Sequence, residues 1–373
     1  MENLLRPLGY TESLMHSIAS NISMKFSFVD TLDIEKFHAA AIDHCNSEAL
    51  SKSNVVQHSN REFFQLMVRE TIPFEIERHE ITDELIQNKL NMHFQTKTGN
   101  IDFVFSENNM ELLVTCPHHV CDVTSILNLI AGTMQLYLND GKAVINNMVC
   151  PDSIETALNI EREQGSLKKT EAKKTSHKAF TTISIKHSAM ERLRKKYNTS
   201  GMANLMSSLI MHEMSNLYTL TELQRYLTID LRRFFPIPQH TFVDYSIGVP
   251  QLLKGINLLP ANEVLDKLIE FNKSSLRPHF LTSEGLKHKF YEHHTLAFSF
   301  IDTNKINFKQ HITPLIQNID AHCNAFYINK KTKLIFILMT KHGDNISLSA
   351  HFDRRNISEN EISQIINAVL INH

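Results

Sequence analysis

Segments with the two-residue period of a β-strand and segments with the period of an α-helix alternate along the whole chain, and this alternation restricts the fold more than any other feature. The strand patterns cover residues 21–29, 101–105, 111–116, 180–186, 224–231, 295–301, 322–328, 333–339 and 345–352. The helical patterns cover residues 33–45, 124–139, 188–197, 202–218, 261–273 and 358–370. Because strands and helices interleave in both halves, we predict a mixed α/β sandwich rather than a pure helical bundle or a pure barrel.

Short polar signals mark where some of these elements begin or turn. Residues 106–109 (Ser-Glu-Asn-Asn) separate two strand patterns and predict a hairpin turn. Asp122 or Thr124 can cap the helix that follows, because a side-chain oxygen there can accept from the first free backbone N–H groups. Near the other end, Ser358 with Glu361 three residues later has the pattern of a capping box.

Residues 161–178 differ in composition from the segments on either side, because charged residues dominate and apolar residues are almost missing. We interpret them as a solvated crossover between an N-terminal part, residues 1–160, and a C-terminal part, residues 179–373. The alternative is a charged surface helix inside a single domain. A length of 373 residues fits one large domain or two coupled ones.

Composition excludes several classes of protein. The formal net charge is -2 and no basic stripe is interleaved with aromatic residues, so we expect no nucleic-acid partner. No apolar run approaches the roughly 18 residues of a membrane span, and the first residues lack the pattern of a signal peptide. The 5 cysteines are scattered and odd in number, which fits a reducing cytoplasm better than a disulfide framework. We therefore expect a cytoplasmic protein.

The segment from Pro117 to Asp122 (Pro-His-His-Val-Cys-Asp) combines the side chains best suited to chemistry. A strand pattern ends at Cys116 and a helix pattern begins directly after Asp122, and such junctions expose side chains at the end of a sheet. His118 lies four residues before Asp122. A neutral imidazole is well suited to take a proton near pH 7, so His118 is a candidate general base.

Other interpretations of this segment stay open. His118 could be a hydrogen-bonded histidine in a strand-end loop, and for His119 we expect packing or support of its neighbours. Cys116, His118, His119, Cys121 and Asp122 could together hold a metal ion; zinc sites favour paired Cys-x-x-Cys spacings, which are missing here, so we expect no metal. Cys121 could act as a nucleophile beside His119, although a free cysteine at such a position is more often a small apolar filler.

The strand–His-x-x-x-Asp–helix pattern near residue 120 of a two-part chain resembles the acyltransferase superfamily of chloramphenicol acetyltransferase, the condensation domains of nonribosomal peptide synthetases and the plant BAHD acyltransferases. Their core is His-x-x-x-Asp-Gly, and residues 118–123 here read His-His-Val-Cys-Asp-Val. Weaker matches cover residues 6–12 (Arg-Pro-Leu-Gly-Tyr-Thr-Glu), 227–232 (Leu-Thr-Ile-Asp-Leu-Arg) and 346–353 (Ile-Ser-Leu-Ser-Ala-His-Phe-Asp). The sequence is most similar to the stand-alone mycobacterial acyltransferases that esterify phthiocerol-type polyketides.

The resemblance implies both a fold and a mechanism. Two α+β two-layer sandwiches of the chloramphenicol acetyltransferase type would form a V with an active-site tunnel between them. His118, which unlike His119 has an Asp four residues later, would take a proton from a hydroxyl or amine acceptor. The acceptor would attack the thioester of an acyl-CoA or of an acyl or peptidyl carrier protein directly, without an acyl-enzyme and without a cofactor. Asp122 would be mainly structural and would pair with a distant arginine, for which Arg232 is the candidate and Arg233 the reserve.

The sequence also departs from the superfamily pattern. Val123 replaces the motif glycine, and a β-branched residue fills space beside the histidine and disfavours positive φ. The plant signature Asp-Phe-Gly-Trp-Gly is missing, since the chain has no Trp. Two functions therefore stay open: an acyltransferase of secondary metabolism, making polyketides or nonribosomal peptides, or a weak or inactive relative that docks a carrier protein or a partner enzyme.

Overall fold

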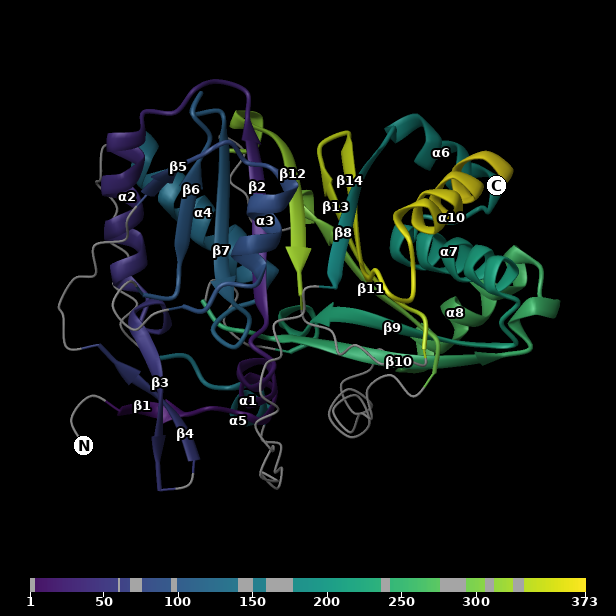
Figure 1. The fold of residues 1–373 in the computed structure, drawn as a ribbon, viewed down its shortest axis with the longest axis horizontal. Coiled ribbons are helices and arrows are strands. Elements are labelled where there is room, and N and C mark those ends of the chain that lie inside the picture. The colour runs from purple at the N-terminus through teal and green to yellow at the C-terminus, as the bar shows by residue number, and fades with distance from the viewer. Residues whose placement is uncertain are drawn as a thin grey trace. The chain divides into compact units, whose positions relative to one another are not determined.

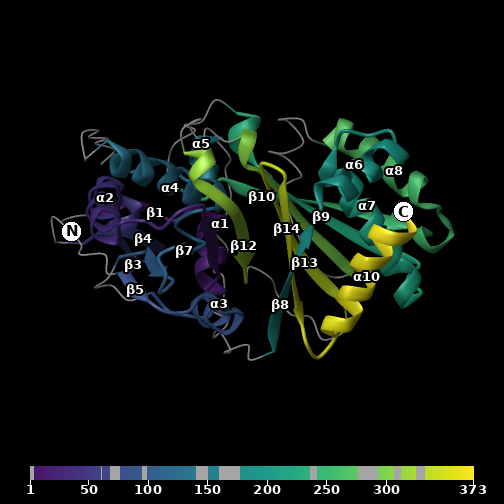
Figure 2. The same cartoon turned by 90° about the horizontal axis from the view of Figure 1, so that it is seen from above.

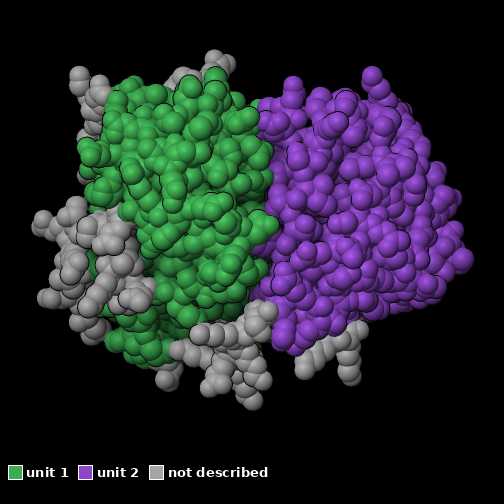
Figure 3. Space-filling view, turned by 45° about the horizontal axis from the view of Figure 1, so that its top comes forward, with its two compact units in different colours: residues 1–175, 237–245, 303–325 green, residues 176–236, 246–302, 326–373 purple. Residues whose placement is uncertain are grey.

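The computed structural model describes residues 4–59, 61–67, 76–94, 99–139, 150–158, 177–235, 242–275, 293–305, 312–324 and 332–373. The chain forms two compact units, which are coloured separately in Figure 3. Unit 1 comprises residues 1–175, 237–245 and 303–325, and unit 2 comprises residues 176–236, 246–302 and 326–373. Each unit has its own sheets and its own helices.

Unit 1 contains a five-stranded sheet in the order β12-β2-β7-β6-β5 and a three-stranded sheet in the order β1-β4-β3 (Figure 1). The strands of the larger sheet are β2 (Asn21–Phe28), β5 (Ile76–Arg78), β6 (Asp102–Phe105), β7 (Glu111–Pro117) and β12 (Ile316–Cys323). Those of the smaller sheet are β1 (Leu4–Pro7), β3 (Ser53–His58) and β4 (Arg61–Leu66). The alternate residues Ile22, Met24, Phe26 and Phe28 are buried, so one face of β2 lies in the core.

Helices cover both faces of the larger sheet of unit 1. The helices are α1 (Tyr10–Ser17), α2 (Ile34–Ser47), α3 (Asp83–Leu90), α4 (Val123–Leu138) and α5 (Ile154–Ala157). Figures 1 and 2 show α3 on one face and α4 on the other, and α4 also packs against α2. The side chain of Asp33 caps α2 by accepting from the Lys36 amide at 3.1 Å, as a short acidic residue at this position commonly does.

Unit 2 is a six-stranded sheet in the order β10-β9-β11-β13-β14-β8. The strands are β8 (Lys178–Ile185), β9 (Glu222–Asp230), β10 (Ser246–Lys254), β11 (Thr295–Asp302), β13 (Leu334–His342) and β14 (Asn345–Asp353). The helices are α6 (His187–Lys196), α7 (Met202–Tyr218), α8 (Ala261–Ser275) and α10 (Glu359–Asn372). These helices lie on one face of the sheet, and their apolar sides form one core with it (Figures 1 and 2).

Short 3₁₀ turns connect several of these elements. They are η1 (Leu50–Lys52), η2 (Leu231–Arg233), η3 (Ile256–Leu258), η4 (Thr303–Lys305) and η5 (Thr313–Leu315). The methionines of α7 (Met202, Met206, Met211 and Met214) are buried in the core of unit 2, where an unbranched side chain fills irregular space.

The predicted mixed α/β architecture is confirmed, together with the elements that have a strong period. Asp122 caps α4 and Ser358 with Glu361 forms the predicted capping box of α10. The strand predicted at 322–328 is misplaced, because β12 runs from Ile316 to Cys323 and residues 325–331 lie outside the described part. Polar residues such as Asp320, which lies 3.8 Å from the Lys25 ammonium, weaken the apolar alternation of this strand.

The division of the chain differs from the predicted one in a way that matters for the site. The predicted C-terminal part, residues 179–373, includes residues 237–245 and 303–325, but the structure places these in unit 1. Strand β12 enters unit 1 because it pairs with β2, from Ile316 opposite Phe28 to Cys323 opposite Ile22. Most of the predicted crossover, residues 161–178, lies outside the described residues, and Lys178 already belongs to β8. Among the described helices, none is both long and apolar enough to cross a membrane.

Candidate active site

The end of β7 fixes the position of His118 in unit 1. The ladder with β2 continues one step past Pro117, because the His118 amide donates to the Ser20 carbonyl at 2.8 Å. A tight turn follows, closed by the Val120 amide donating to the Pro117 carbonyl at 3.0 Å. Asp122 then caps α4. The sheet and the helix therefore hold the loop from both sides, and the His118 side chain is 11% exposed.

A buried carboxylate faces the ring of His118. Asp244 Oδ2 lies 3.2 Å from His118 Nδ1, and the Asp244 side chain is fully buried. Burial lowers the pKa of His118, but the charge of Asp244 and the Cys323 thiol outweigh burial and raise this pKa well above its ordinary value. A carboxylate on Nδ1 also fixes the ring orientation and directs the other nitrogen away from it.

Cys323 is the other side chain that acts on His118. It ends β12 and lies in register with Ile22 of β2, which is itself paired with Cys116 of β7. Directly opposed residues of antiparallel strands point to the same face, so Cys323 shares the face of the sheet that carries these two residues. Its thiol contributes to the raised pKa of His118.

Asp122 supports the site through the segment that carries Asp244. One oxygen of Asp122 accepts from the Ser125 amide at 2.8 Å, and the other accepts from the Tyr245 amide at 2.9 Å. Ser125 Oγ donates to the Val243 carbonyl at 2.7 Å and accepts from the Val243 amide at 3.2 Å. The first turn of α4 thus forms hydrogen bonds with the residues on both sides of Asp244, and these bonds set the orientation of the Asp244 carboxylate.

The resemblance implies that Arg232 pairs with Asp122. Arg232 lies in η2 of unit 2 and is buried, and its Nη1 is 3.1 Å from Asp230 Oδ1. The reserve candidate Arg233 is exposed. Because Asp122 belongs to unit 1, the Asp122–Arg232 pair would join the two units, and it stays a prediction.

His119 points into packed surroundings. Its ring contacts His16 edge to face at a centroid distance of 4.8 Å and stacks on Phe64 at 6.3 Å. Burial, with smaller contributions from His16 and His118, lowers the pKa of His119 well below its ordinary value. A neutral ring held in this way serves packing, and His118 is the histidine with a carboxylate partner.

The departure at Val123 is compatible with the backbone. Val123 is the first residue of α4 and is partly buried. The described non-glycine residues with positive φ are Ala19, Ser59, Asn109, Asn198 and Thr219, and Val123 is not among them. The helix therefore begins here without the left-handed conformation that favours glycine.

The structure also bears on the thiol and metal interpretations of this segment. Burial and contact with Cys116 raise the pKa of the Cys121 thiol well above its ordinary value, which keeps it neutral and opposes a role as nucleophile. Among the described residues, the ligand atoms that converge as a group of three belong to another part of the chain, in unit 2.

The opening segment that matched the superfamily forms a buried ion pair. Arg6 Nη2 lies 2.6 Å from Glu12 Oε1, and Glu12 Oε2 accepts from the Gly9 amide at 2.7 Å. A Cβ on Gly9 would lie 2.0 Å from Glu155 Oε2, so this position has no room for a side chain. The Arg-x-x-Gly-x-x-Glu spacing thus reflects local packing of β1 and α1.

A mixed α/β chain of two units, with a histidine at the junction between a strand and a helix and a capping aspartate four residues later, is the arrangement of a known fold. No protein-family model matches the sequence, and no curated protein matches it. Solved structures do match: polyketide synthase associated protein 5 from Mycobacterium tuberculosis has a TM-score of 0.76 at 12% identity, covering 99% of this chain and 98% of that one.

Two further structures show the breadth of this fold. The first condensation domain of the CDA synthetase has a TM-score of 0.70 at 10% identity, covering 99% of this chain and 94% of that one. Trichothecene 15-O-acetyltransferase from Fusarium sporotrichioides has a TM-score of 0.71 at 10% identity, covering 98% and 93%. The chain therefore has the fold of condensation domains and related acyltransferases, and the resemblance stated from the motif is confirmed at the level of the fold.

Proposed function

We propose that the protein is an acyltransferase in which His118 is the general base. The observation that carries the proposal is the ring of His118 at the end of β7, paired at Nδ1 with the buried carboxylate of Asp244 at 3.2 Å. Such a pair suits a base that must carry a positive charge briefly during reaction. The fold supports the same class of reaction, since one matched structure is named as an acetyltransferase and others as condensation domains.

The proposed reaction needs one proton carrier and no resident cofactor. Neutral His118 takes the proton from the acceptor hydroxyl or amine as its oxygen or nitrogen attacks the thioester carbonyl. The tetrahedral adduct then collapses, the carbon–sulfur bond breaks, and the departing thiolate takes the proton from His118. Asp244 balances the charge of the protonated ring in between.

The donor, the acceptor and the setting are part of the proposal. The donor is a thioester of coenzyme A or of an acyl or peptidyl carrier protein, and the product is an ester or amide in polyketide or nonribosomal peptide synthesis. The matched structures named for a polyketide synthase associated protein and a condensation domain support this setting. The five cysteines are all free, which supports a place in the reducing cytoplasm. The V-shaped arrangement around a tunnel stays a prediction of the resemblance.

The test is acyl transfer measured as thiol release from a short-chain acyl-CoA in the presence of a panel of alcohols and amines. We expect His118→Ala to lower kcat by about 100- to 10,000-fold, the usual contribution of a general base. His79→Ala, which alters an exposed histidine in the same unit, is the matched control. Circular dichroism and thermal melting establish that each variant is folded.

The competing function, a non-catalytic module that docks a carrier protein, predicts a different outcome. In that case the wild-type protein transfers no acyl group from any donor, or the folded His118→Ala variant transfers it at the wild-type rate. Either result overturns the proposal for His118.

A further inference from the structure

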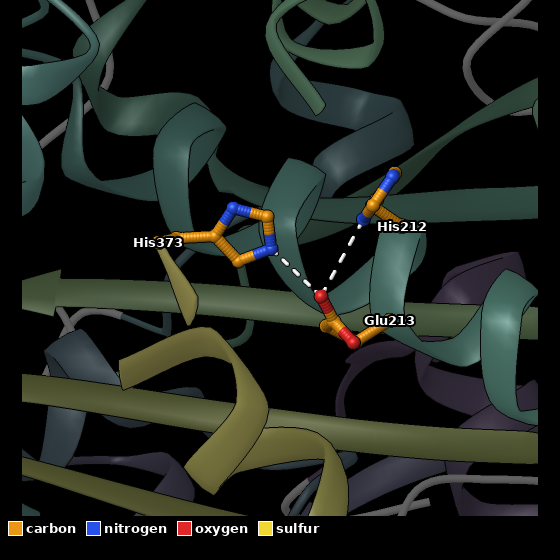
Figure 4. Close-up of side chains that lie close together, drawn as sticks. All are labelled: His212, Glu213 and His373. Carbon is orange, nitrogen blue, oxygen red and sulfur yellow. Dashed lines mark hydrogen bonds and ion pairs between the residues drawn. The ribbon is translucent and has the colours of Figure 1, made fainter. Parts of the chain in front are cut away.

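Two histidines and a glutamate converge in unit 2, on the side of the sheet that carries the helices. His212 and Glu213 lie on α7, and His373 follows directly after α10 (Figure 4). Glu213 Oε1 lies 2.7 Å from His373 Nε2 and 3.5 Å from His212 Nδ1. One ligand atom from each of the three side chains lies within 4.8 Å of the other two, and among the described residues this group alone meets that condition.

The distances between the ligand atoms of these side chains are close to those around a bound zinc ion. Ligand atoms bonded at about 2.0–2.1 Å to a tetrahedral zinc ion lie about 3.3 Å apart. The separation between Glu213 and His212 already has this size, and the shorter one between Glu213 and His373 must widen by about half an ångström to admit the ion. The three side chains are 18%, 13% and 10% exposed, so an ion could reach them from water.

A neighbouring tyrosine hydroxyl forms a hydrogen bond with the His373 ring nitrogen that does not face Glu213. The Tyr197 hydroxyl lies 2.6 Å from His373 Nδ1, the nitrogen on the far side of the ring from Glu213. Metal-binding histidines almost always use their second nitrogen in this way, because the bond fixes the tautomer and aims the first nitrogen. A simple histidine–glutamate ion pair needs neither a hydroxyl on the second ring nitrogen nor a second imidazole near the same carboxylate oxygen. Both features are present here and favour a metal site.

One contact must be exchanged when an ion binds. The Asn216 side-chain amide lies 3.3 Å from His212 Nδ1, one turn further along α7. Asn216 is exposed and His212 is partly buried, so water can replace the lost contact, and a rotation of the Asn216 side chain frees the nitrogen.

We propose that His212, Glu213 and His373 bind one divalent cation of the zinc class, with water as the remaining ligand. Two imidazoles with one carboxylate are a donor set that suits zinc. The ion would tie the end of α10 to α7, whose apolar faces already share one core. This site lies outside the residues proposed for catalysis and is independent of the acyl-transfer proposal. It also departs from the expectation of a chain without metal.

The experiment uses the full chain without a histidine tag, freed of metal with a chelator and titrated with Zn²⁺ and with Co²⁺. Calorimetry measures the stoichiometry and the Kd, and visible absorption of the cobalt form reports nitrogen and oxygen coordination. We expect one equivalent of Zn²⁺ to bind and to raise the Tm, because a ligand of the folded state stabilises it.

Variants of the proposed ligands distinguish a specific metal site from weak Zn²⁺ binding by histidines elsewhere in the chain. We expect His212→Ala, Glu213→Gln and His373→Ala each to weaken Zn²⁺ binding about tenfold or more, and Tyr197→Phe to weaken it about tenfold, the usual cost of losing support behind a ligand. His187→Ala is the matched control, because its ring lies 3.9 Å from both Glu191 and Asp344 without a second imidazole. The proposal is overturned if no equivalent binds, or if the three ligand variants bind Zn²⁺ as the control does.

Discussion

The ring of His118 faces a carboxylate that the His-x-x-x-Asp motif does not contain. Asp244 stabilises the protonated ring and so raises the pKa of His118. Such a ring is a stronger base once deprotonated, but a smaller fraction of the protein is then ready to react. The position of Asp244 should therefore set the pH range in which the protein works.

This consequence can be measured with Asp244→Asn. We expect kcat/KM of the wild type to rise with pH through a pKa above the ordinary histidine value, because the neutral ring is the active form in the proposed mechanism. In Asp244→Asn the acid limb should move to lower pH, since the charge that raises the pKa is gone. The rate on the plateau should fall by about 100-fold or more, because the imidazolium formed during reaction loses its partner.

The control for this variant is Asp266→Asn, which changes an exposed carboxylate on α8. Steady-state kinetics between pH 5.5 and about 9.5 would cover the acid limbs of the wild type and of the variant, given where histidines ordinarily titrate. An acid limb that stays in place in the folded Asp244→Asn variant would contradict the role of Asp244.

At the scale of residues, the motif predicts part of the site. His118 and Asp122 could be chosen because their spacing and their place between a strand and a helix are visible in the sequence. Asp244 and Cys323 could not, because nothing in their neighbours marks them and they reach His118 through tertiary packing. The hydrogen bond from the Tyr245 amide to Asp122 also has no signal in the sequence, and the pair of Asp122 with Arg232 stays a prediction.

At the scale of elements, the contact between α2 and α4 depends on a glycine. Gly132 of α4 lies against the ring of His44 on α2, and a Cβ at this position would be 2.4 Å from His44 Cε1. The ring is buried, and burial lowers the pKa of His44 to about 4. Both helices lie in unit 1, and α4 begins at the proposed site, so this contact sets how α4 sits on the sheet.

We expect Gly132→Ala to destabilise the protein by about 1–3 kcal/mol, because overpacking outweighs the gain of up to about 1 kcal/mol from alanine in a helix. Urea unfolding measures the difference. Gly201→Ala is the control for steric crowding, since a Cβ there meets its nearest atom at 3.7 Å; because Gly201 is the N-cap of α7, this variant should cost only the loss of a preferred N-cap residue. The double variant Gly132→Ala with His44→Ala should recover part of the stability that Gly132→Ala loses. If Gly132→Ala alone is as stable as the wild type, the packing argument is contradicted.

The elements missed from the sequence have identifiable physical reasons. Strand β10 contains Gly248 and Pro250, two residues that normally argue against a strand. It is an edge strand, where a proline costs no ladder bond on the open side, and the ring of Tyr226 occupies the space above Gly248. Strand β4 pairs with β1 on one side and with β3 on the other, and the short, mixed patterns of β3 and β4 carry little periodicity.

At the scale of the whole molecule, unit 1 contains several histidines that are buried in neutral form. Burial lowers the pKa of His44 and of His322 to about 4 each, and lowers that of His119 well below its ordinary value. In the unfolded chain these rings titrate near 6.5, so between the two values the unfolded state binds more protons. The free energy of unfolding must then fall as the pH falls through this window.

We expect urea unfolding to show a loss of stability between pH 6.5 and about 4, where His44 and His322 should each lower the free energy of unfolding by about 3 kcal/mol at the acid end. His118 acts in the opposite sense: its raised pKa contributes stability at low pH that is lost as the pH rises through that pKa. His44→Gln should reduce the slope of the free energy of unfolding against pH in this window by up to the equivalent of one proton. His79→Gln, which alters an exposed ring, should leave this slope unchanged. A slope that His44→Gln leaves as in the wild type would contradict this account.

The entry of residues 242–245 and of β12 into unit 1 has a consequence for how the protein is made. A ribosome delivers His118 and Asp122 first, Asp244 follows more than a hundred residues later, and Cys323 follows later still. Through most of synthesis, strand β2 presents an unpaired edge, and the histidine has neither its carboxylate nor its thiol neighbour. His118 therefore acquires its carboxylate and thiol neighbours late in folding, so a chain truncated before Asp244 would carry the motif without the environment of the proposed base.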